Sequence, residues 1–470
     1  MQRLHLHAYR ASAGSLHDGS RLPPPRRISP ASPMNSLVSP NYEKLWSDPG
    51  LQARIDEGIR SHRQSDAVVR TVDFAGKPMP GVKVRVSQHD SPFHFGANIF
   101  KLRDYPSEEL NRGYEDAFCA LFNGATVPFY WRTLEPEQGR PRYGAHSVPI
   151  ARRPPPDTVV KFCEERGLRM HGHTFVWNFR KWSVPDWLPE NPDQAAPLWE
   201  KRIADIAARY GDRIKRWDVL NEPVAFYERT PRGLVMQDDY EGKAFDWAGK
   251  YLPADTRLDI NEITPAWTEE KQEDYTRLIE RLLATRRHVG GIGLQFHHFS
   301  DDELAKILAG ETFTPGILLS ALDHYHGRFR LPVHVSEITL TAPGNTPEGL
   351  DAQALAARNF YRLWFSHPAV DGITWWNLPD GGGAPGENKV YSGLLFDDMR
   401  PKPAYLALQD LIRREWRTQT EGVSDADGCF RFRGFHGSYL IRTESGNKDS
   451  GIQSAITLEP GKTASQLIRL

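Results

Sequence analysis

The chain has little cysteine, little net charge and no long apolar run, and each of these absences excludes a class of protein. Its 470 residues include only 3 Cys, whose spacing matches neither a disulfide framework nor a zinc site. The net charge is −1, whereas nucleic acid and anionic membranes select a basic surface, so we expect neither as a partner. No stretch approaches about 18 consecutive apolar residues, and we therefore expect no membrane-spanning helix.

The N-terminal segment lacks the continuous apolar stretch of a secretory signal. It is rich in Arg, Pro, Ser and His, so residues 1–41 are predicted to be disordered or extended, and Met34 is an alternative start. The three cysteines, Cys119, Cys163 and Cys429, lie far apart in the sequence, which fits a reducing compartment. These features favour a cytoplasmic location, with secretion as the alternative.

Both ends of the chain carry short patterns that differ from its middle. An Asp-Pro pair opens an amphipathic helix predicted over residues 48–63, and residues 67–88 have the alternation and turn of a β-hairpin. The C-terminal residues 419–470 hold further strand patterns. Neither piece has enough strands to close a core alone, so we predict that residues 42–90 and 419–470 form one small accessory β domain, packed as a β-sandwich.

Between these segments, short apolar strands alternate with helical patterns. Candidate strands begin near residues 93, 124, 168, 214, 256, 291, 332 and 371. Eight strands, each followed by a helix or a long loop, predict an α/β protein with a (β/α)8 TIM barrel over residues 91–418. A doubly wound open sheet is the alternative fold, but no G-x-G-x-x-G follows a strand.

Two of these strands end in a carboxylate. Residues 216–223 read Arg-Trp-Asp-Val-Leu-Asn-Glu-Pro, in which a β-prone run leads to Glu222, and residues 333–338 repeat the design and lead to Glu337. Because the strand C-termini of a parallel barrel converge on one face, we expect the two side chains to meet there. A pair of carboxylates is the minimal equipment for glycoside hydrolysis. The alternative is that both are ordinary strand-end acids that cap a following helix.

Six segments carry recognisable motifs in a fixed order. They are residues 172–177 (GHTFVW), 216–223 (RWDVLNEP), 293–297 (GLQFH), 333–338 (VHVSEI), 372–376 (GITWW) and 395–405 (LFDDMRPKPAY). Together they resemble the motifs of glycoside hydrolase family 10, the xylanase family, and the resemblance extends over residues 93–416. It implies a (β/α)8 barrel, with Glu222 as the acid/base and Glu337 as the nucleophile of a retaining reaction.

Seven further residues are candidates for sugar binding, and they are His173, Trp177, Asn221, Gln295, His297, Trp376 and Tyr130. Asn221 precedes the acid, so its amide is placed to donate to the 2-OH beside the reacting carbon. Gln295 and His297 lie two apart on one strand and share a face. The resemblance implies that His297 orients the nucleophile and that His173 contacts the sugar nearest the cut, with Trp177 and Trp376 as walls. For Asn221 and His297, the alternative is a residue that only satisfies its neighbours.

An alternative interpretation of the histidines is that they bind a metal ion. His171 and His173, together with His297 and His298, have the chemistry of zinc ligands. No H-x-x-x-H or carboxylate ligand spacing accompanies them. We therefore expect no metal and no other cofactor.

The second strand departs from the family pattern. Where the family carries Glu-Asn-x-x-Lys, which grips xylose upstream of the cut, residues 125–132 read Ala-Thr-Val-Pro-Phe-Tyr-Trp-Arg, and Asn178 replaces a second His. The expected partner is an oligo- or polysaccharide, by default xylan or xylo-oligosaccharides, with short or decorated oligosaccharides hydrolysed faster than linear xylan. The alternatives are the same mechanism on another glycan and a non-catalytic carbohydrate-binding protein. A monomer is the default expectation.

Overall fold

The computed structural model describes residues 36–470 apart from 225–238, 264–268, 386, 388–390 and 446–447. The predicted disorder of residues 1–41 therefore lies almost entirely outside the described residues. Helix α1 (Pro40–Trp46) is followed by α2 (Pro49–Arg63), which begins where the sequence predicts a helix because Asp48 accepts a hydrogen bond from the Leu51 N–H. Within the described residues, no helix has the length and apolarity needed to cross a membrane.

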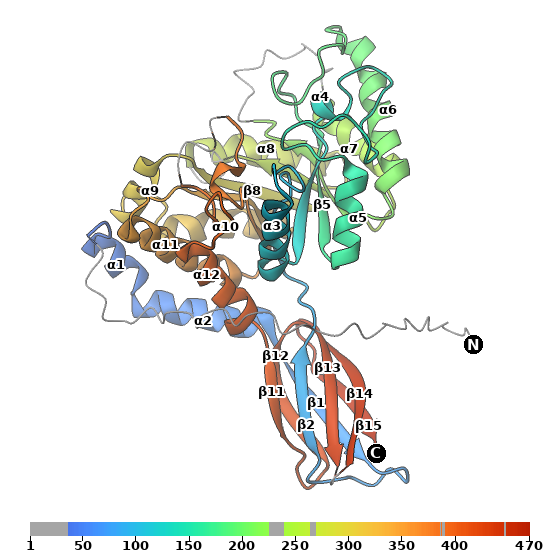
Figure 1. The fold of residues 1–470 in the computed structure, drawn as a ribbon, viewed down its shortest axis with the longest axis vertical. Coiled ribbons are helices and arrows are strands. Elements are labelled where there is room, and N and C mark those ends of the chain that lie inside the picture. The colour runs from blue at the N-terminus through green and yellow to red at the C-terminus, as the bar shows by residue number, and fades with distance from the viewer. Residues whose placement is uncertain (1–35, 225–238, 264–268, 386, 388–390, 446–447) are drawn as a thin grey trace. The chain divides into compact units, whose positions relative to one another are not determined.

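Eight parallel strands close into a barrel in the order β10-β3-β4-β5-β6-β7-β8-β9, which confirms the predicted (β/α)8 architecture (Figure 1). The strands are β3 (His94–Asn98), β4 (Gly124–Pro128), β5 (Arg169–Val176), β6 (Arg216–Asn221), β7 (Arg257–Glu262), β8 (Gly291–His298), β9 (Val333–Leu340) and β10 (Val370–Trp375). Each begins within a few residues of its predicted start. Their residues are almost all buried, as expected for strands enclosed by helices.

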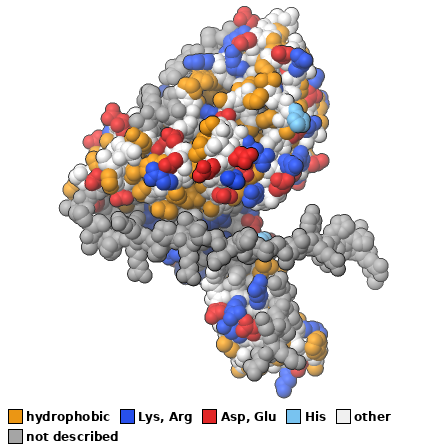
Figure 2. All heavy atoms as spheres, viewed as in Figure 1, with side chains coloured by type: hydrophobic (Ala, Val, Ile, Leu, Met, Phe, Trp, Pro, Cys, Tyr) orange, Lys and Arg blue, Asp and Glu red, His pale blue; other side chains and the backbone are white. Residues whose placement is uncertain are grey.

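Several helices of the barrel start at side-chain caps. Thr314 and Thr346 accept hydrogen bonds from first-turn N–H groups of α10 and α11, and Ser300 forms a reciprocal capping box with Glu303 in α9. The helices are α3 (Glu108–Leu121), α4 (Trp131–Leu134), α5 (Pro156–Arg166), α6 (Pro192–Tyr210), α7 (Tyr240–Tyr251), α8 (Glu269–Ala284), α9 (Asp301–Leu308), α10 (Pro315–Phe329), α11 (Pro347–Ser366) and α12 (Pro403–Asp410). On the face drawn in Figure 2, acidic and basic side chains are interspersed, as the near-zero net charge predicts.

Irregularities in strand pairing occur in the strands that carry candidate site residues. Between β8 and β9, Leu294 pairs with Val335 but Gln295 pairs with Glu337, so Ser336 is an extra residue in β9. The pairings of β6 with β5 and with β7 also shift register. A bulge of this kind re-aims side chains and lets consecutive residues serve one site.

The two ends of the chain form a pair of small sheets, in the orders β12-β1-β15 and β11-β2-β13-β14. The strands are β1 (Gln64–Val72), β2 (Lys83–Gln88), β11 (Gln419–Val423), β12 (Cys429–Phe435), β13 (Gly437–Ser445), β14 (Lys448–Leu458) and β15 (Ala464–Arg469). Figure 1 shows β1 and β2 lying among the C-terminal strands. The sheets share a core that includes Val69, Val84 and Ile441, which confirms the accessory β domain built from both termini.

The expected hairpin pairing of residues 67–88 is wrong. β1 pairs with β12 and β15, whereas β2 pairs with β11 and β13, so the two strands belong to different sheets. Only one isolated bridge, Val72 with Pro78, follows the hairpin register. Pro78 and Pro80 lack the N–H groups that a continuing ladder needs, and the segment between the strands crosses from one sheet to the other.

Arg63 ties the end of α2 to the barrel. Its guanidinium donates to the carbonyl oxygens of Phe365, His367 and Val370, and it lies over the Phe93 ring with 4.9 Å to the centroid. Because charged donors to carbonyls are strong hydrogen bonds, Arg63 fixes the point at which α2 continues into β1.

Candidate active site

The candidate residues lie in the C-terminal halves of the barrel strands or directly after them. Glu222 and Trp376 follow β6 and β10, Trp177 follows β5, and Tyr130 lies two residues beyond β4. The others lie within strands and are His173 in β5, Asn221 in β6, Gln295 and His297 in β8, and Glu337 in β9. This is the end of a parallel barrel where functional groups converge.

A chain of short hydrogen bonds connects the two glutamates. Gln295 Nε2 donates to Glu222 Oε1 at 3.0 Å and to Asn221 Oδ1 at 3.3 Å. Asn261 Nδ2 donates to the same Asn221 oxygen at 2.9 Å and to Glu337 Oε1 at 2.8 Å. Within the described residues, both side-chain hydrogen bonds of Asn221 use its oxygen, which leaves its NH2 group to donate to a sugar hydroxyl.

Glu337 is buried and held by donors on both oxygens. Beside the bond from Asn261, His297 Nε2 lies 3.1 Å from Glu337 Oε2, and His297 Nδ1 lies 3.0 Å from the Thr339 hydroxyl. Burial lowers the pKa of His297 to about 4, so the ring is neutral at pH 7 and carries one proton. With that proton on Nε2 the ring donates to Glu337, and the Thr339 hydroxyl donates to Nδ1.

Glu222 has a constrained backbone and a carboxyl group that resists ionisation. Its φ is 50°, in the left-handed region, and its N–H donates to the Asn261 carbonyl at 2.8 Å. The Val224 N–H donates to Glu262 Oε2 at 2.8 Å, which fixes the turn that follows. Burial and the neighbouring Glu337 raise the pKa of Glu222 to about 8, so Glu222 holds a proton at neutral pH.

Burial also raises the pKa of Glu337. Because the charge of Glu337 contributes to the raised pKa of Glu222, the ionisations of the two carboxyl groups are coupled. Asn261 and His297 both donate to Glu337 and stabilise its anion. We therefore assign the first ionisation of the pair to Glu337 and the retained proton to Glu222.

His173 lies between the glutamates and an aromatic wall. Its Nδ1 is 2.8 Å from Asp218 Oδ2, which orients the ring. Although burial alone would raise it, His171 and His173 hold the pKa of Asp218 below its usual range. The His173 ring contacts Tyr130 and Trp376, with centroids 5.4 and 5.5 Å apart.

The aromatic wall is a cluster of Phe100, Tyr130 and Trp376, with Trp177 packed against it. Of the three consecutive aromatic residues Phe129, Tyr130 and Trp131, Tyr130 belongs to this cluster and the other two do not. Phe129 packs on Tyr210 and Trp217, and Trp131 packs on Trp187 and Trp199, so both rings lie among the barrel helices. Sequence reasoning missed that the alternating direction of successive residues separates Tyr130 from its neighbours.

Three further residues, Asn261, Arg152 and Arg153, were missed. Asn261 closes the β7 segment Leu-Asp-Ile-Asn-Glu at 258–262, and this run ends in the same Asn-Glu pair as the β6 motif, a signal that was available in the sequence. Arg152 and Arg153 come from the loop between α4 and α5, which has no motif. Arg152 donates to Asn377 Oδ1 at 3.1 Å and to Glu387 Oε2 at 3.3 Å, beside the aromatic wall.

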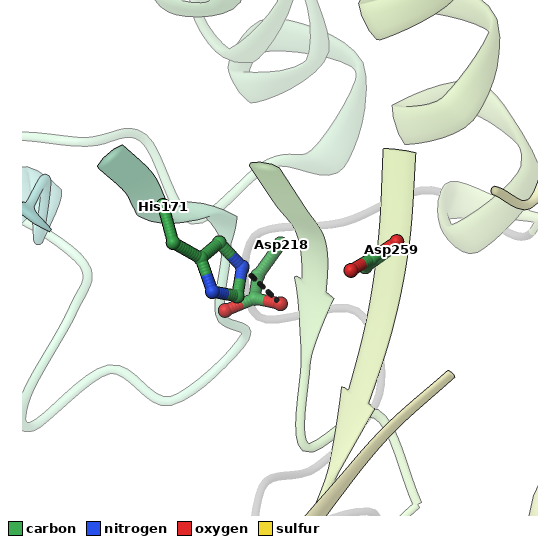
Figure 3. A group of neighbouring side chains, drawn as sticks. All are labelled: His171, Asp218 and Asp259. Carbon is green, nitrogen blue, oxygen red and sulfur yellow. Dashed lines mark ion pairs between the residues drawn. The ribbon is translucent and has the colours of Figure 1, made fainter. Parts of the chain in front are cut away.

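His171, Asp218 and Asp259 form the group with metal-ligand geometry among the described residues, and Figure 3 shows them on the neighbouring strands β5, β6 and β7. The His171 Nε2 is 3.0 Å from Asp218 Oδ1. Arg216 and Arg257 lie 2.6 and 2.7 Å from the two oxygens of Asp259. These pairs already balance the carboxylates, so the group is a buried ion-pair network. Of the four histidines considered as zinc ligands, His171 alone belongs to it.

A closed (β/α)8 barrel with two glutamates connected by hydrogen bonds at its C-terminal end has the arrangement of a barrel-type glycoside hydrolase. A family model described as glycosyl hydrolase family 10 matches residues 131–411, more than half of the chain. The chain therefore belongs to glycosyl hydrolase family 10, and the resemblance seen in the motifs is confirmed.

Individual relatives are identical to the chain at about a quarter of the aligned positions. Endo-1,4-beta-xylanase 2 of Arabidopsis thaliana is 26% identical over 77% of this chain and 31% of its own length, and the anti-sigma-I factor RsgI6 of Acetivibrio thermocellus is 25% identical over 88% and 49%. The chain thus spans about a third of the length of the first of these relatives and about half of the length of the second. Native xylanase 10B of Thermotoga maritima matches with a TM-score of 0.57 at 22% identity, covering 69% of this chain and 96% of that structure, which supports the fold.

Proposed function

We propose that the chain is a retaining glycoside hydrolase that cleaves β-1,4 bonds between xylose units. The observation that carries the proposal is the hydrogen-bonded path from Glu222 through Gln295, Asn221 and Asn261 to Glu337. It joins the two carboxyl groups in one site, where Glu222 as the protonated group and Glu337 as the ionised group supply the acid and the nucleophile that double displacement requires. Family membership and the xylanase names of several relatives support xylose as the sugar.

In the first step, Glu337 attacks the anomeric carbon and Glu222 protonates the leaving oxygen. In the second step, Glu222 takes a proton from water, and the resulting hydroxide displaces Glu337 from the sugar. Asn221 donates its free NH2 group to the 2-OH, and His173 faces the same sugar with its Nε2, since its Nδ1 is used by Asp218.

The proposed preference for short substrates follows from the second strand, in which the family's polar side chains are replaced. Tyr130 stands where the family pattern has polar side chains that grip xylose, so fewer polar contacts are available to a long unbranched chain. We propose that short or decorated xylo-oligosaccharides are hydrolysed faster than linear xylan.

The test is a digestion of xylo-oligosaccharides, branched xylo-oligosaccharides and linear xylan, with proton NMR of the first product formed. Retention predicts the β-anomer at early times, before mutarotation. Early appearance of the α-anomer would contradict double displacement. A kcat/KM on linear xylan above that on oligosaccharides would contradict the length preference.

A second candidate, glycan binding without turnover, is favoured by one observation. The relative named as an anti-sigma-I factor aligns with 88% of this chain. Turnover of an aryl β-xylobioside decides between the two, because a binding module gives a dissociation constant but no released phenol.

A further inference from the structure

Arg153 presents a cation at the aromatic wall of the candidate active site. Its guanidinium carbon lies 4.0 Å from the centre of the Tyr130 ring and 5.2 Å from that of Phe100. Both rings belong to the cluster that contains Trp376, and Tyr130 also contacts His173. Tyr130 therefore contacts both Arg153 and His173, a residue of the sugar site in the proposed function.

The loop that carries Arg153 is built to hold it in place. The preceding Arg152 has a φ of 60°, and its N–H donates to Asp104 Oδ2 at 2.9 Å. The Arg152 side chain donates hydrogen bonds to Gly382, Asn377 and Glu387. A non-glycine residue with a positive φ that is held by such hydrogen bonds commonly positions a functional side chain.

The Arg153 side chain is bonded differently from that of Arg152. Arg153 donates one hydrogen bond, to the Arg152 carbonyl at 2.8 Å, and its buried Nε has no acceptor in the described part of the chain. Arg152 has an ion pair with Glu387, whereas Arg153 has none within the described ranges. Burial lowers the pKa of Arg153 to about 10, so the group stays charged at neutral pH. A half-buried guanidinium without a carboxylate partner is costly unless its remaining donors are satisfied.

We propose that Arg153 binds the carboxylate of a uronic acid carried by the substrate, so that the enzyme acts on acidic, glucuronate-bearing xylo-oligosaccharides. The inference rests on the proposed function and specifies its substrate. A guanidinium has a planar donor fork that matches a carboxylate, and Nε is one prong of that fork. Glu387 also acts electrostatically on Arg153, which favours a singly charged group over a phosphate dianion.

The experiment compares kcat/KM on two xylo-oligosaccharides of equal length, one bearing a glucuronosyl branch and one unbranched. Wild type is expected to prefer the acidic substrate about tenfold, and Arg153→Gln to lose most of that preference while its rate on the neutral substrate changes less than about threefold. Arg153→Lys should fall between them, since it keeps the charge but not the fork.

Arg140→Gln is the matched control, because Arg140 lies on the same loop and pairs with Glu137 at an exposed position. It should retain the wild-type preference. The proposal is overturned if Arg153→Gln lowers both rates equally or neither, at unchanged melting temperature. If wild type hydrolyses neither substrate, the proposed function fails by itself. Calorimetric binding of the two oligosaccharides to wild type and Arg153→Gln then decides the role of Arg153, with a lost acidic preference as support and an unchanged ratio as refutation.

Discussion

The two halves of the C-terminal end of the barrel differ in the side chains that line them. On strands β6–β9 the site is a network of amides, carboxyl groups and a neutral imidazole, joined by hydrogen bonds of 2.6 to 3.3 Å. After β10, β3, β4 and β5 it is a wall of aromatic rings, with Arg153 over the Tyr130 ring. The first half sets the protonation and charge of the two glutamates, so it should control kcat. The second half provides aromatic surface and one cation for the sugar, so it should control KM and selectivity.

The largest effect is expected from the nucleophile. Glu337→Ala should lower kcat by a factor on the order of 10⁴ or more on every substrate, because no other group can form the glycosyl-enzyme bond. Glu222→Ala should lose a similar factor on xylo-oligosaccharides but far less on dinitrophenyl xylobioside, whose leaving group needs no proton. Steady-state kinetics on the two substrates measure this contrast. Equal losses in both variants would remove the distinction between acid and nucleophile.

Asn261 tests whether the network acts as a unit. Asn261→Ala removes the donor shared by Asn221 and Glu337, and it leaves the buried Ser336 hydroxyl, which donates to Asn261 Oδ1 at 2.6 Å, without its acceptor. We expect kcat to fall about 100-fold with KM changed much less. Asn359→Ala, which loses a remote bond to Tyr42, is the matched control and should leave kcat unchanged. A loss confined to KM would mean that Asn261 only shapes the sugar site.

The pH profile separates the same two carboxyl groups. With the pKa of Glu222 at about 8, kcat/KM should fall as pH rises through that value, because the general acid loses its proton. Gln295 donates to Glu222 and lowers its pKa, so Gln295→Leu should move the alkaline limb to higher pH. Profiles of kcat/KM between pH 5 and about 10 test this, and an alkaline limb that stays in place, or moves down, would contradict the assignment.

The sequence predicts the site residues on β6–β9 better than those around the aromatic wall, for a physical reason. Glu222 follows β6 and Glu337 lies in the C-terminal half of β9, and in a parallel barrel such positions bring side chains to one end, as they do for Gln295 and His297 in β8. Arg153 lies on a loop whose path depends on tertiary contacts such as that between Arg152 and Glu387. The mistaken hairpin has the same origin, since strand partners from residues 419–470 decide how β1 and β2 pair.

The smallest effect is expected at the wall. Tyr130→Ala removes a ring that contacts His173 and Trp177, so KM for short xylo-oligosaccharides should rise about 5–10-fold, while kcat on an aryl xylobioside stays within about threefold. Tyr130→Phe keeps the ring and should behave like wild type. The pH profile should not move in either variant, because neither carboxyl group loses a partner. If Tyr130→Ala instead lowered kcat and shifted the alkaline limb, the wall would share in holding the proton on Glu222, and the division between the two halves would fail.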